Sequence, residues 1–294
     1  EVKVKSVPYK GMVDDGIAYV RLTRFTRNCA SEVEQAILEL TDENDVKGLV
    51  LDLRGNPGGL LNESVSLCNL FIDKNQEVVS TKGKIKDWEK SYKTMKEPLD
   101  KELPLALLIN QSSASASEIV SGTIQDLDRG VVLGKKSFGK GLVQQTRKLS
   151  YNSQLKVTVA KYYSPSGRCI QALDYTNKNE DGSVGKVPDS LKTAFKTRNG
   201  RTVYDGGGVD PDIVIDQVAF AKIVGSLVSK QLVFDFATEF VLQNDSIEAP
   251  GVFKISDALY EDFVMFLSDK EYEYKTNTEK KMAELIDKAE DEYA

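Results

Sequence analysis

Residues 111–121 read Gln-Ser-Ser-Ala-Ser-Ala-Ser-Glu-Ile-Val-Ser, and the rest of the chain is organised around this stretch. The apolar run Leu105–Ile109 precedes it and predicts a buried strand. Ile119, Val120 and Ile124 follow at helical spacing and predict a helix. Small residues therefore lie at a strand-to-helix turn, which can hold a serine hydroxyl above the end of a sheet beside helix N–H groups. Taken alone, the stretch also fits an ordinary serine-rich helix cap.

Composition excludes several classes of protein. The chain has 294 residues, of which 40% are hydrophobic, so it can form one large domain or two modest ones. A net charge of −6 argues against nucleic acid as a general partner and against a polybasic membrane patch. The absence of histidine excludes a Ser-His-Asp triad, a Cys-His pair and zinc held by histidine. Cys29, Cys68 and Cys169 lie far apart without CxxC spacing, which argues against a disulfide scaffold, and Cys68 is predicted to be in the core.

Strands and helices alternate through the first part of the chain, which predicts an α/β fold. A second turn of small residues, Arg54-Gly-Asn-Pro-Gly-Gly59, follows the predicted strand 46–53. Both turns come after the carboxyl ends of strands, where clefts form in open α/β sheets. Beyond Asp216 the pattern is helical. We therefore expect two domains: residues 1–215, a β-strand lead-in with an α/β domain, and 216–294, a helical region whose helices are predicted at 218–244, 256–268 and 275–293.

A serine can attack an amide only if a base removes its proton, and without histidine the candidates are lysine and carboxylates. Lys140 lies between two glycines in Phe138-Gly-Lys-Gly141, although a solvated lysine in a β-turn gives the same pattern. An ordinary lysine has a pKa of ~10.4 and a working base needs ~7–8, a difference of about 4 kcal/mol that burial can supply. Phe138, Leu142 and Val143 are suitable apolar neighbours, and Gln144 could accept a hydrogen bond from the amine.

An oxyanion hole requires backbone N–H groups directed at the developing negative charge. One donor could be Ala116, which follows Ser115 directly. The other could be Gly58 or Gly59 in the second turn. A plain β-turn that leads into a helix explains the same glycine pair.

Several segments together resemble the C-terminal processing peptidases, or tail-specific proteases, which are serine peptidases with a Ser–Lys dyad. The resemblance covers roughly residues 10 to 215, and five motifs in the family's order carry it. The motifs are Asp52-Leu-Arg-Gly-Asn-Pro-Gly-Gly-Leu60, Asn110 with Ser113-Ala-Ser-Ala-Ser-Glu-Ile119, Ser137-Phe-Gly-Lys-Gly141 with Val143-Gln144, Tyr162-Tyr-Ser-Pro-Ser-Gly-Arg-Cys-Ile-Gln171, and Gly207-Gly-Val-Asp-Pro-Asp212.

The resemblance implies a role for each matching residue. The nucleophile is Ser115, with Ser113 and Ser117 as rivals on sequence alone, and the base is Lys140, oriented by Gln144. The oxyanion donors are Ala116 and one glycine of the pair Gly58 and Gly59. The core is expected to be similar to the Clp-protease and crotonase type of α/β fold. No metal and no other cofactor is required.

The resemblance also implies the substrate and the place of action. Substrates are flexible or unfolded polypeptides that are cut near their C-termini. We expect an extended substrate to pair with the strand that contains Leu142, Val143 and Gln145. The family acts mostly outside the cytoplasm, in the bacterial periplasm or cell envelope or in the plastid lumen.

The chain departs from the family pattern in two places. Members usually have a PDZ domain before the core, and this chain is expected to begin where that domain would end. The helical region has no family motif, and we interpret it as a subdomain for oligomerisation or for support of the core. Two other functions stay open: a resting or inactive core that only binds peptides, and a crotonase-like acyl-CoA enzyme, which would not use the predicted serine, lysine and glutamine. The tricorn-like branch uses a histidine, so the sequence argues against it.

Overall fold

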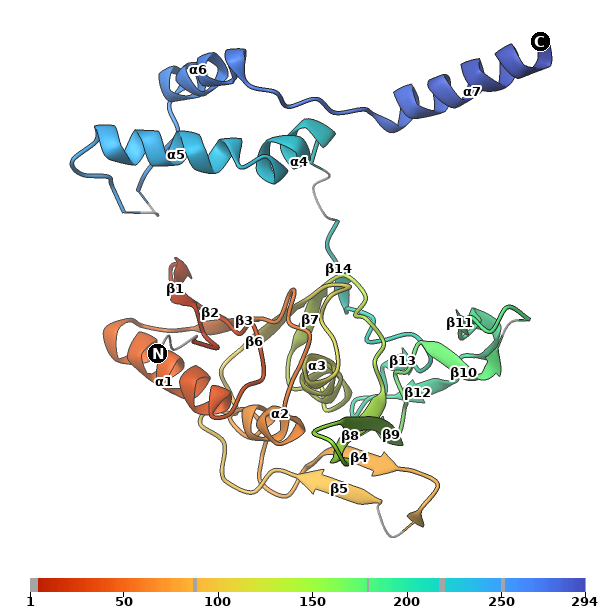
Figure 1. The fold of residues 1–294 in the computed structure, drawn as a ribbon. Coiled ribbons are helices and arrows are strands. Elements are labelled where there is room, and N and C mark those ends of the chain that lie inside the picture. Colours follow the sequence, from red (N-terminus) through yellow and green to blue (C-terminus); the bar gives the residue numbers. More distant parts are fainter. Residues whose placement is uncertain (1–4, 87–88, 179, 217–219, 250–251, 294) are drawn as a thin grey trace. The chain divides into compact units, whose positions relative to one another are not determined.

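The fold is described from a computed structural model that covers residues 5–86, 89–178, 180–216, 220–249 and 252–293. The chain forms two compact units, Glu1–Asp216 and Gln217–Ala294. The first unit is α/β and the second is helical, as predicted (Figure 1).

The main sheet of the first unit has six strands in the order β1-β2-β3-β6-β7-β14. All neighbouring pairs are parallel except β1 and β2. The strands are β1 (Tyr9–Asp14), β2 (Ile17–Arg21), β3 (Gly48–Asp52), β6 (Leu105–Ile109), β7 (Val131–Gly134) and β14 (Ile213–Val214). The helices that connect the parallel strands are α1 (Cys29–Glu43), α2 (Leu61–Cys68) and α3 (Ala116–Asp126). Because the strand order advances in one direction, right-handed crossovers place all three helices on the same face of the sheet.

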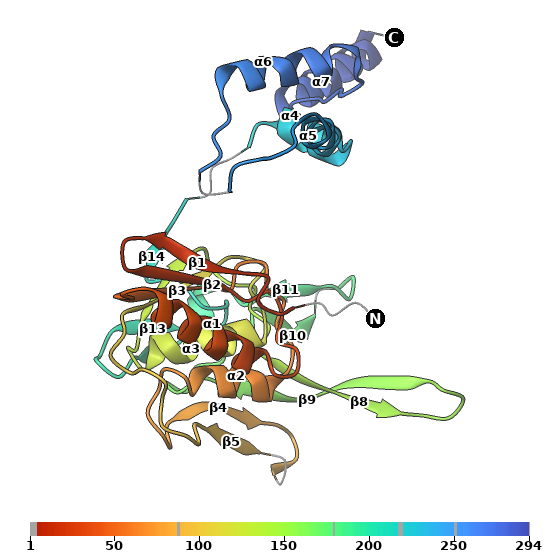
Figure 2. The ribbon, with the colours of Figure 1, turned by 90° about the vertical axis from the view of Figure 1, so that its left-hand side faces the viewer.

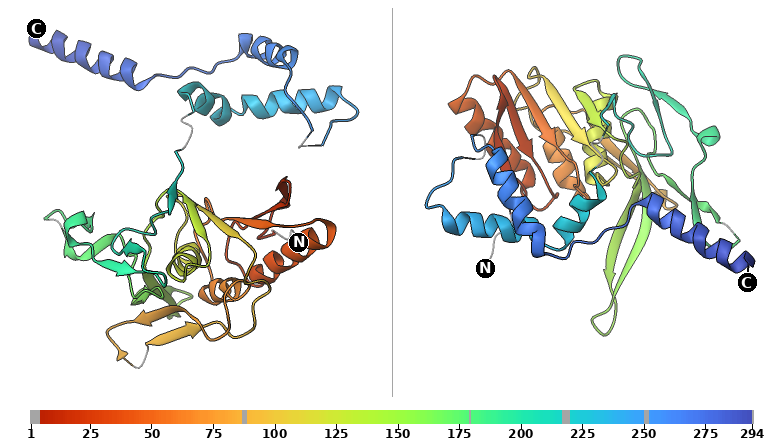
Figure 3. Two further views of the ribbon diagram at one scale, coloured as in Figure 1. Left: turned by 180° about the vertical axis from the view of Figure 1, so that it is seen from behind. Right: turned by 90° about the horizontal axis from the view of Figure 1, so that it is seen from above.

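A second sheet covers the other side of this helical layer (Figures 1 and 2). It is antiparallel, in the order β5-β4-β9-β8. Its strands are β4 (Glu77–Lys82), β5 (Lys90–Lys93), β8 (Leu142–Lys148) and β9 (Gln154–Tyr163). The hairpin of β8 and β9 extends away from the body of the unit, as the green ribbon in Figures 2 and 3 shows. β8 is the edge strand, so one side of its backbone is not paired within the sheet.

The polar insertion between β9 and β14 forms two short antiparallel ribbons, β10 with β11 and β12 with β13. Their bounds are β10 (Leu173–Lys178), β11 (Val184–Lys186), β12 (Ala194–Lys196) and β13 (Thr202–Tyr204), with a 3-10 turn, η2, at Asp189–Leu191.

The core lies between the six-stranded sheet and the helices. Alternate residues of a strand point to opposite faces, so only every second residue of the central strands is buried against the helices. Leu49 and Leu51 of β3 and Leu107 of β6 are at most 2% exposed, whereas the residues between them are half-buried on the other face. Cys68 is fully buried in this core, as predicted.

The second unit consists of α4 (Lys222–Ser229), α5 (Leu232–Gln243), α6 (Asp257–Phe266), the 3-10 turn η3 (Leu267–Asp269) and α7 (Asn277–Tyr293). The prediction of one helix over 218–244 is wrong, because Gln231 adopts a left-handed conformation, with φ of 61°, and separates α4 from α5. Leu227, Leu232 and Leu267 form a small core of this unit. Among the described residues, every helix is too short or too polar to cross a membrane.

Candidate active site

Ser115 lies at the turn between β6 and α3, directly before the first residue of the helix. Its backbone has φ of 57° and ψ of −111°, a conformation that non-glycine residues rarely adopt. Such strain persists only where the surroundings hold it in place, and it is concentrated at functional sites. The turn is fixed by backbone bonds on both sides, from Ser113 N–H to Asn110 O and from Ala114 N–H to Asn56 O.

The three candidate serines differ in what their hydroxyls contact. Ser113 is completely buried and donates to Leu53 O at 2.8 Å. Ser117 is also completely buried, and it donates to Asn56 O at 3.0 Å. Ser115 is half-buried and lines a pocket. Two of the three hydroxyls therefore hold the glycine-rich turn in place, and Ser115 is the one that can meet a substrate.

The glycine-rich turn packs directly against the serine turn. A Cβ atom on Gly58, whose φ is 94°, would lie 2.6 Å from Ala114 O and 2.8 Å from Ala116 N, so only glycine allows this approach. The N–H of Gly58 donates to Asn56 Oδ1 at 2.9 Å. The N–H groups of Gly59 and Ala116 have no hydrogen-bond partner within the described part of the chain. Of the two predicted glycines, Gly59 therefore has the available donor, and it lines the pocket with Ala116.

The buried carboxylate of Asp52 stabilises the start of the glycine-rich turn. Asp52 accepts hydrogen bonds from Tyr19 Oη at 2.6 Å and from the backbone N–H of Arg54 at 2.8 Å. The Arg54 guanidinium forms an ion pair with it at 2.7 Å. Burial raises the pKa of Asp52, but these hydrogen bonds outweigh burial and leave it below its usual value. Asp52 is therefore charged in the folded state and fixes the start of the turn.

Lys140 lies in the loop between β7 and β8, and its side chain lines the same pocket as Ser115. Gly139 makes this loop possible, because a Cβ atom there would lie 2.3 Å from Ala172 Cβ and its φ is 88°. Gly141 N–H donates to Gln171 Oε1 at 2.8 Å. Among the described residues no ion pair involves Lys140, and no carboxylate lines its pocket.

Glu118 connects the serine turn to the lysine loop. It is only 2% exposed, and its Oε2 atom accepts from the backbone N–H of Ser115 at 2.7 Å and of Lys140 at 2.9 Å. Its Oε1 atom accepts from Gly139 N–H and from Ser137 Oγ, both at 2.6 Å. Burial raises the pKa of Glu118, and the four hydrogen bonds oppose this effect. One side chain thus sets the spacing between the predicted nucleophile and the predicted base.

Tyr162 of β9 makes a second connection. Its hydroxyl donates to Ser115 O at 3.2 Å and forms a short hydrogen bond to Lys140 O. Complete burial, and then the negative charge of Glu118, raise the pKa of Tyr162 well above its usual value. The phenol therefore keeps the proton that it donates.

The pocket has a volume of about 320 Å³ and brings together most of the predicted site residues. They are Ser115, Lys140, Gln144, Ala116, Gly59, Leu142 and Val143. Phe138, which is 55% exposed, and Gln145 are not among the pocket residues of the described chain. Pairing of a substrate with the backbone of β8 does not require the Gln145 side chain to line the pocket, so that expectation stays a prediction. The β-strand period directs the side chains of Gln144 and Gln145 to opposite faces of β8, so only Gln144 lines the pocket.

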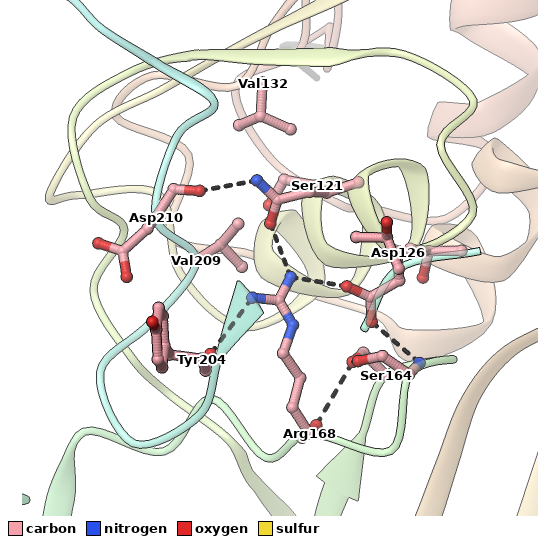
Figure 4. A network of polar contacts seen from close by, with 12 residues as sticks. Ser121, Asp126, Val132, Ser164, Arg168, Tyr204, Val209 and Asp210 are labelled. Atoms are coloured by element: carbon pink, nitrogen blue, oxygen red, sulfur yellow. Dashed lines mark hydrogen bonds and ion pairs between the residues drawn. The ribbon is translucent and has the colours of Figure 1, made fainter. Parts of the chain in front are cut away.

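The two remaining motifs form a buried network at the other end of α3 (Figure 4). Arg168, which is 1% exposed, pairs with Asp126 at 2.8 Å and donates to Gln125 Oε1 at 2.7 Å. Gln125 in turn donates to Asp210 O at 2.8 Å. The loops 162–171 and 207–212 are thus fastened to the C-terminus of the helix whose N-terminus follows Ser115. Their role is to position α3.

Sequence reasoning did not assign a role to Glu118, Tyr162 or Asn56. Glu118 had a signal, because a glutamate three residues after a serine at a helix start is the spacing of a capping box. The contacts of Tyr162 and Asn56 join segments far apart in the chain, so no local pattern indicated them.

Two family profiles match parts of this chain. Residues 16–180 match the profile described as "Peptidase family S41". Residues 223–294 match the profile described as "Probable PDZ-protease, C-terminal helical domain". The second match gives the helical region a family relation that its sequence pattern had not indicated.

Individual relatives match over part of their length. A "Carboxy-terminal-processing protease" of Bartonella bacilliformis is 42% identical over 178 residues, which is 60% of this chain and 40% of the relative. A "Probable CtpA-like serine protease" of Staphylococcus aureus is 40% identical over 231 residues, covering 70% of this chain and 46% of the relative. The solved structure of a photosystem II D1 C-terminal processing protease is 30% identical with a TM-score of 0.52, covering 73% of this chain and 46% of that chain. The chain thus spans less than half the length of these relatives, and the matches confirm the family resemblance of the motifs.

Proposed function

We propose that this chain, which belongs to peptidase family S41, contains the catalytic core of a serine endopeptidase with Ser115 as nucleophile and Lys140 as general base. One observation carries the proposal. Of three closely spaced serines, Ser115 alone faces a pocket, and the same pocket contains Lys140 and no carboxylate. A lysine base needs such a site, because a nearby carboxylate would stabilise the protonated amine.

The proposed reaction has two halves. In the first, the neutral amine of Lys140 takes the hydroxyl proton of Ser115 while Oγ forms a bond to the peptide carbonyl carbon. The free N–H groups of Gly59 and Ala116 stabilise the resulting oxyanion. Lys140 then gives the proton to the amine as the C–N bond breaks. In the second half, Lys140 takes a proton from a water molecule as its oxygen attacks the acyl carbon. The bond between that carbon and Ser115 Oγ then breaks, and Lys140 returns the proton to Oγ.

We propose that the substrate is a flexible or unfolded polypeptide bound in extended form. The unpaired edge of β8 is next to the pocket and supports this mode, because an extended chain can add to it as a further strand. Apolar walls from Leu60, Leu61 and Ile119 favour small or apolar side chains beside the scissile bond. As the family resemblance implies, we propose cleavage near polypeptide C-termini and action outside the cytoplasm.

A resting form of the same site is a second candidate. Ser115 and Lys140 line one pocket, but no hydrogen bond joins the serine Oγ to the lysine Nζ in this structure. A general base needs its target within about 2.6–3.2 Å. We propose that substrate binding closes this gap by a small movement of the loop 135–141.

The test is degradation of a permanently unfolded polypeptide by the full chain, with the cut positions determined by mass spectrometry. We expect cuts near the C-terminus and no cuts with Ser115→Ala. Equal cutting by both proteins would refute the proposal. Binding of the polypeptide without cutting by either protein would favour the resting form.

A further inference from the structure

The site pocket contains a second lysine, Lys156, which the reaction above does not use. It lies on β9, and its side chain lines the pocket together with Ser115, Lys140 and Gln144. No sequence pattern distinguishes Lys156 from the many other lysines in the chain.

Strand pairing explains how Lys156 reaches the site. Gln144 of β8 is directly opposite Thr158 of β9, and a bulge precedes this pair. Lys156 is two residues before Thr158, so the two side chains are on the same face of the strand. The side chain of Lys156 is therefore the diagonal neighbour of Gln144, within reach for a long side chain.

The charge of Lys156 is not compensated in this pocket. Within the described residues its ammonium has no ion pair and no hydrogen bond, and none of the twelve pocket residues is acidic. Glu118, the carboxylate that joins the serine turn to the lysine loop, is buried and already accepts four hydrogen bonds. The pocket thus combines apolar walls with an available cation. Such a site attracts a negatively charged group of its ligand.

We propose that Lys156 binds a carboxylate of the peptide substrate and so helps to select where the chain is cut. The proposal rests on the protease function above and names the substrate group that this side of the site recognises. The carboxylate comes either from the C-terminal end of the substrate or from an acidic side chain close to the scissile bond. A terminal carboxylate would favour cleavage within a few residues of the end.

The test uses synthetic peptides around a cut that the full chain makes in an unfolded polypeptide. One peptide ends in a free carboxylate a few residues beyond the cut, and its twin ends in a carboxamide. A third amide peptide has one Glu, and a fourth has Gln at the same place. kcat/KM is measured for the parent, Lys156→Met, Lys156→Arg and, as the control, Lys148→Met. Lys148 is an exposed lysine of β8 that does not line the pocket.

Because Lys156 is exposed, we expect the parent to prefer the carboxylate peptide by about two- to fivefold, the range for an exposed ion pair. Lys156→Met should bring the ratio close to one, whereas Lys156→Arg and Lys148→Met should keep it. If the parent instead prefers the Glu peptide to the Gln peptide, and Lys156→Met loses that preference, the recognised carboxylate belongs to an acidic side chain of the substrate. A parent that distinguishes neither pair, or a preference that survives in Lys156→Met, would overturn the proposal.

Measurements of peptide binding test carboxylate recognition independently of peptide cleavage. The anisotropy of the labelled peptides is measured with Ser115→Ala, with and without Lys156→Met. Weaker binding of the carboxylate peptide to the double variant supports carboxylate recognition even if no peptide is cut. Equal binding to Ser115→Ala within both pairs, carboxylate against carboxamide and Glu against Gln, would contradict it, while cleavage by the parent would leave the protease function intact.

Discussion

Glu118 gives the sharpest prediction of how the site is assembled. Each oxygen of its carboxylate accepts two hydrogen bonds. Oε2 accepts from the backbone N–H groups of Ser115 and Lys140, and Oε1 accepts from Ser137 Oγ and the backbone N–H of Gly139. Glu118→Gln keeps the shape of the side chain and replaces one oxygen by an NH₂ group. Whichever way the amide is oriented, its NH₂ group lies beside two hydrogen-bond donors. Both donors then lose the oxygen that accepted their hydrogen bonds.

The expected cost follows from these contacts. A buried donor without a partner costs about 1–3 kcal/mol, so two of them cost about 2–6 kcal/mol. The substitution also removes a buried charge, and because burial raises the pKa of Glu118, this change returns part of the loss. We therefore expect the free energy of unfolding to fall by about 2–4 kcal/mol.

The assay is urea denaturation followed by circular dichroism, combined with kcat on an unfolded polypeptide. Glu43→Gln, at the exposed end of α1, is the matched control and should change neither quantity. At a urea concentration where both proteins are folded, Glu118→Gln should also lose at least about tenfold in kcat, because the spacing of nucleophile and base is no longer fixed. A variant within about 0.5 kcal/mol of the parent and with parental kcat would refute the reasoning.

Three further outcomes are expected. Tyr162→Phe removes a hydroxyl whose single proton is shared between Ser115 O and Lys140 O, and it should lower the free energy of unfolding by about 1–3 kcal/mol; an unchanged urea midpoint would contradict this. Although burial raises it, the pKa of Asp52 is lowered overall by its hydrogen bonds, so its stabilisation is present above about pH 4 and is lost as the pH falls through the folded-state pKa. The urea midpoint should therefore depend less on pH below about 4 in Asp52→Asn than in the parent, and identical profiles would speak against the role of this carboxylate. Burial raises the pKa of all three thiols, to about 12 for Cys29 and Cys68, which are completely buried, whereas Cys169 is only half-buried. At pH 8 a disulfide reagent should therefore modify Cys169 alone until the chain is unfolded, and rapid modification of all three thiols would exclude the buried placement.

The fold could be predicted from the sequence because local patterns specified it. Buried strands such as 105–109 read as continuous apolar runs, and the helices after them had apolar residues at a period of 3.6. The break at Gln231 could not be predicted, because a left-handed residue other than glycine has no reliable sequence signal and the apolar pattern continues across it.

The candidate site was predictable where chemistry restricted the choice. Without histidine, a serine nucleophile needs another base, and this requirement makes Lys140 a candidate. The choice among the three serines, and between Gly58 and Gly59, depended on which groups were already hydrogen-bonded, which is a property of the folded chain. The position of Lys156 depends on the register of the hairpin, and a bulge beside Gln144 shifts that register.

The most direct measurement of the central claim is the cleavage rate of one unfolded polypeptide by the parent, Ser115→Ala, Lys140→Ala and the control Lys148→Ala. If Ser115 is the nucleophile and Lys140 its base, both site variants should lose at least about a hundredfold in rate and the control should keep the parental rate. Parental cleavage by Lys140→Ala would contradict the account, because another group, such as Lys156 in the same pocket, would then have to activate the serine.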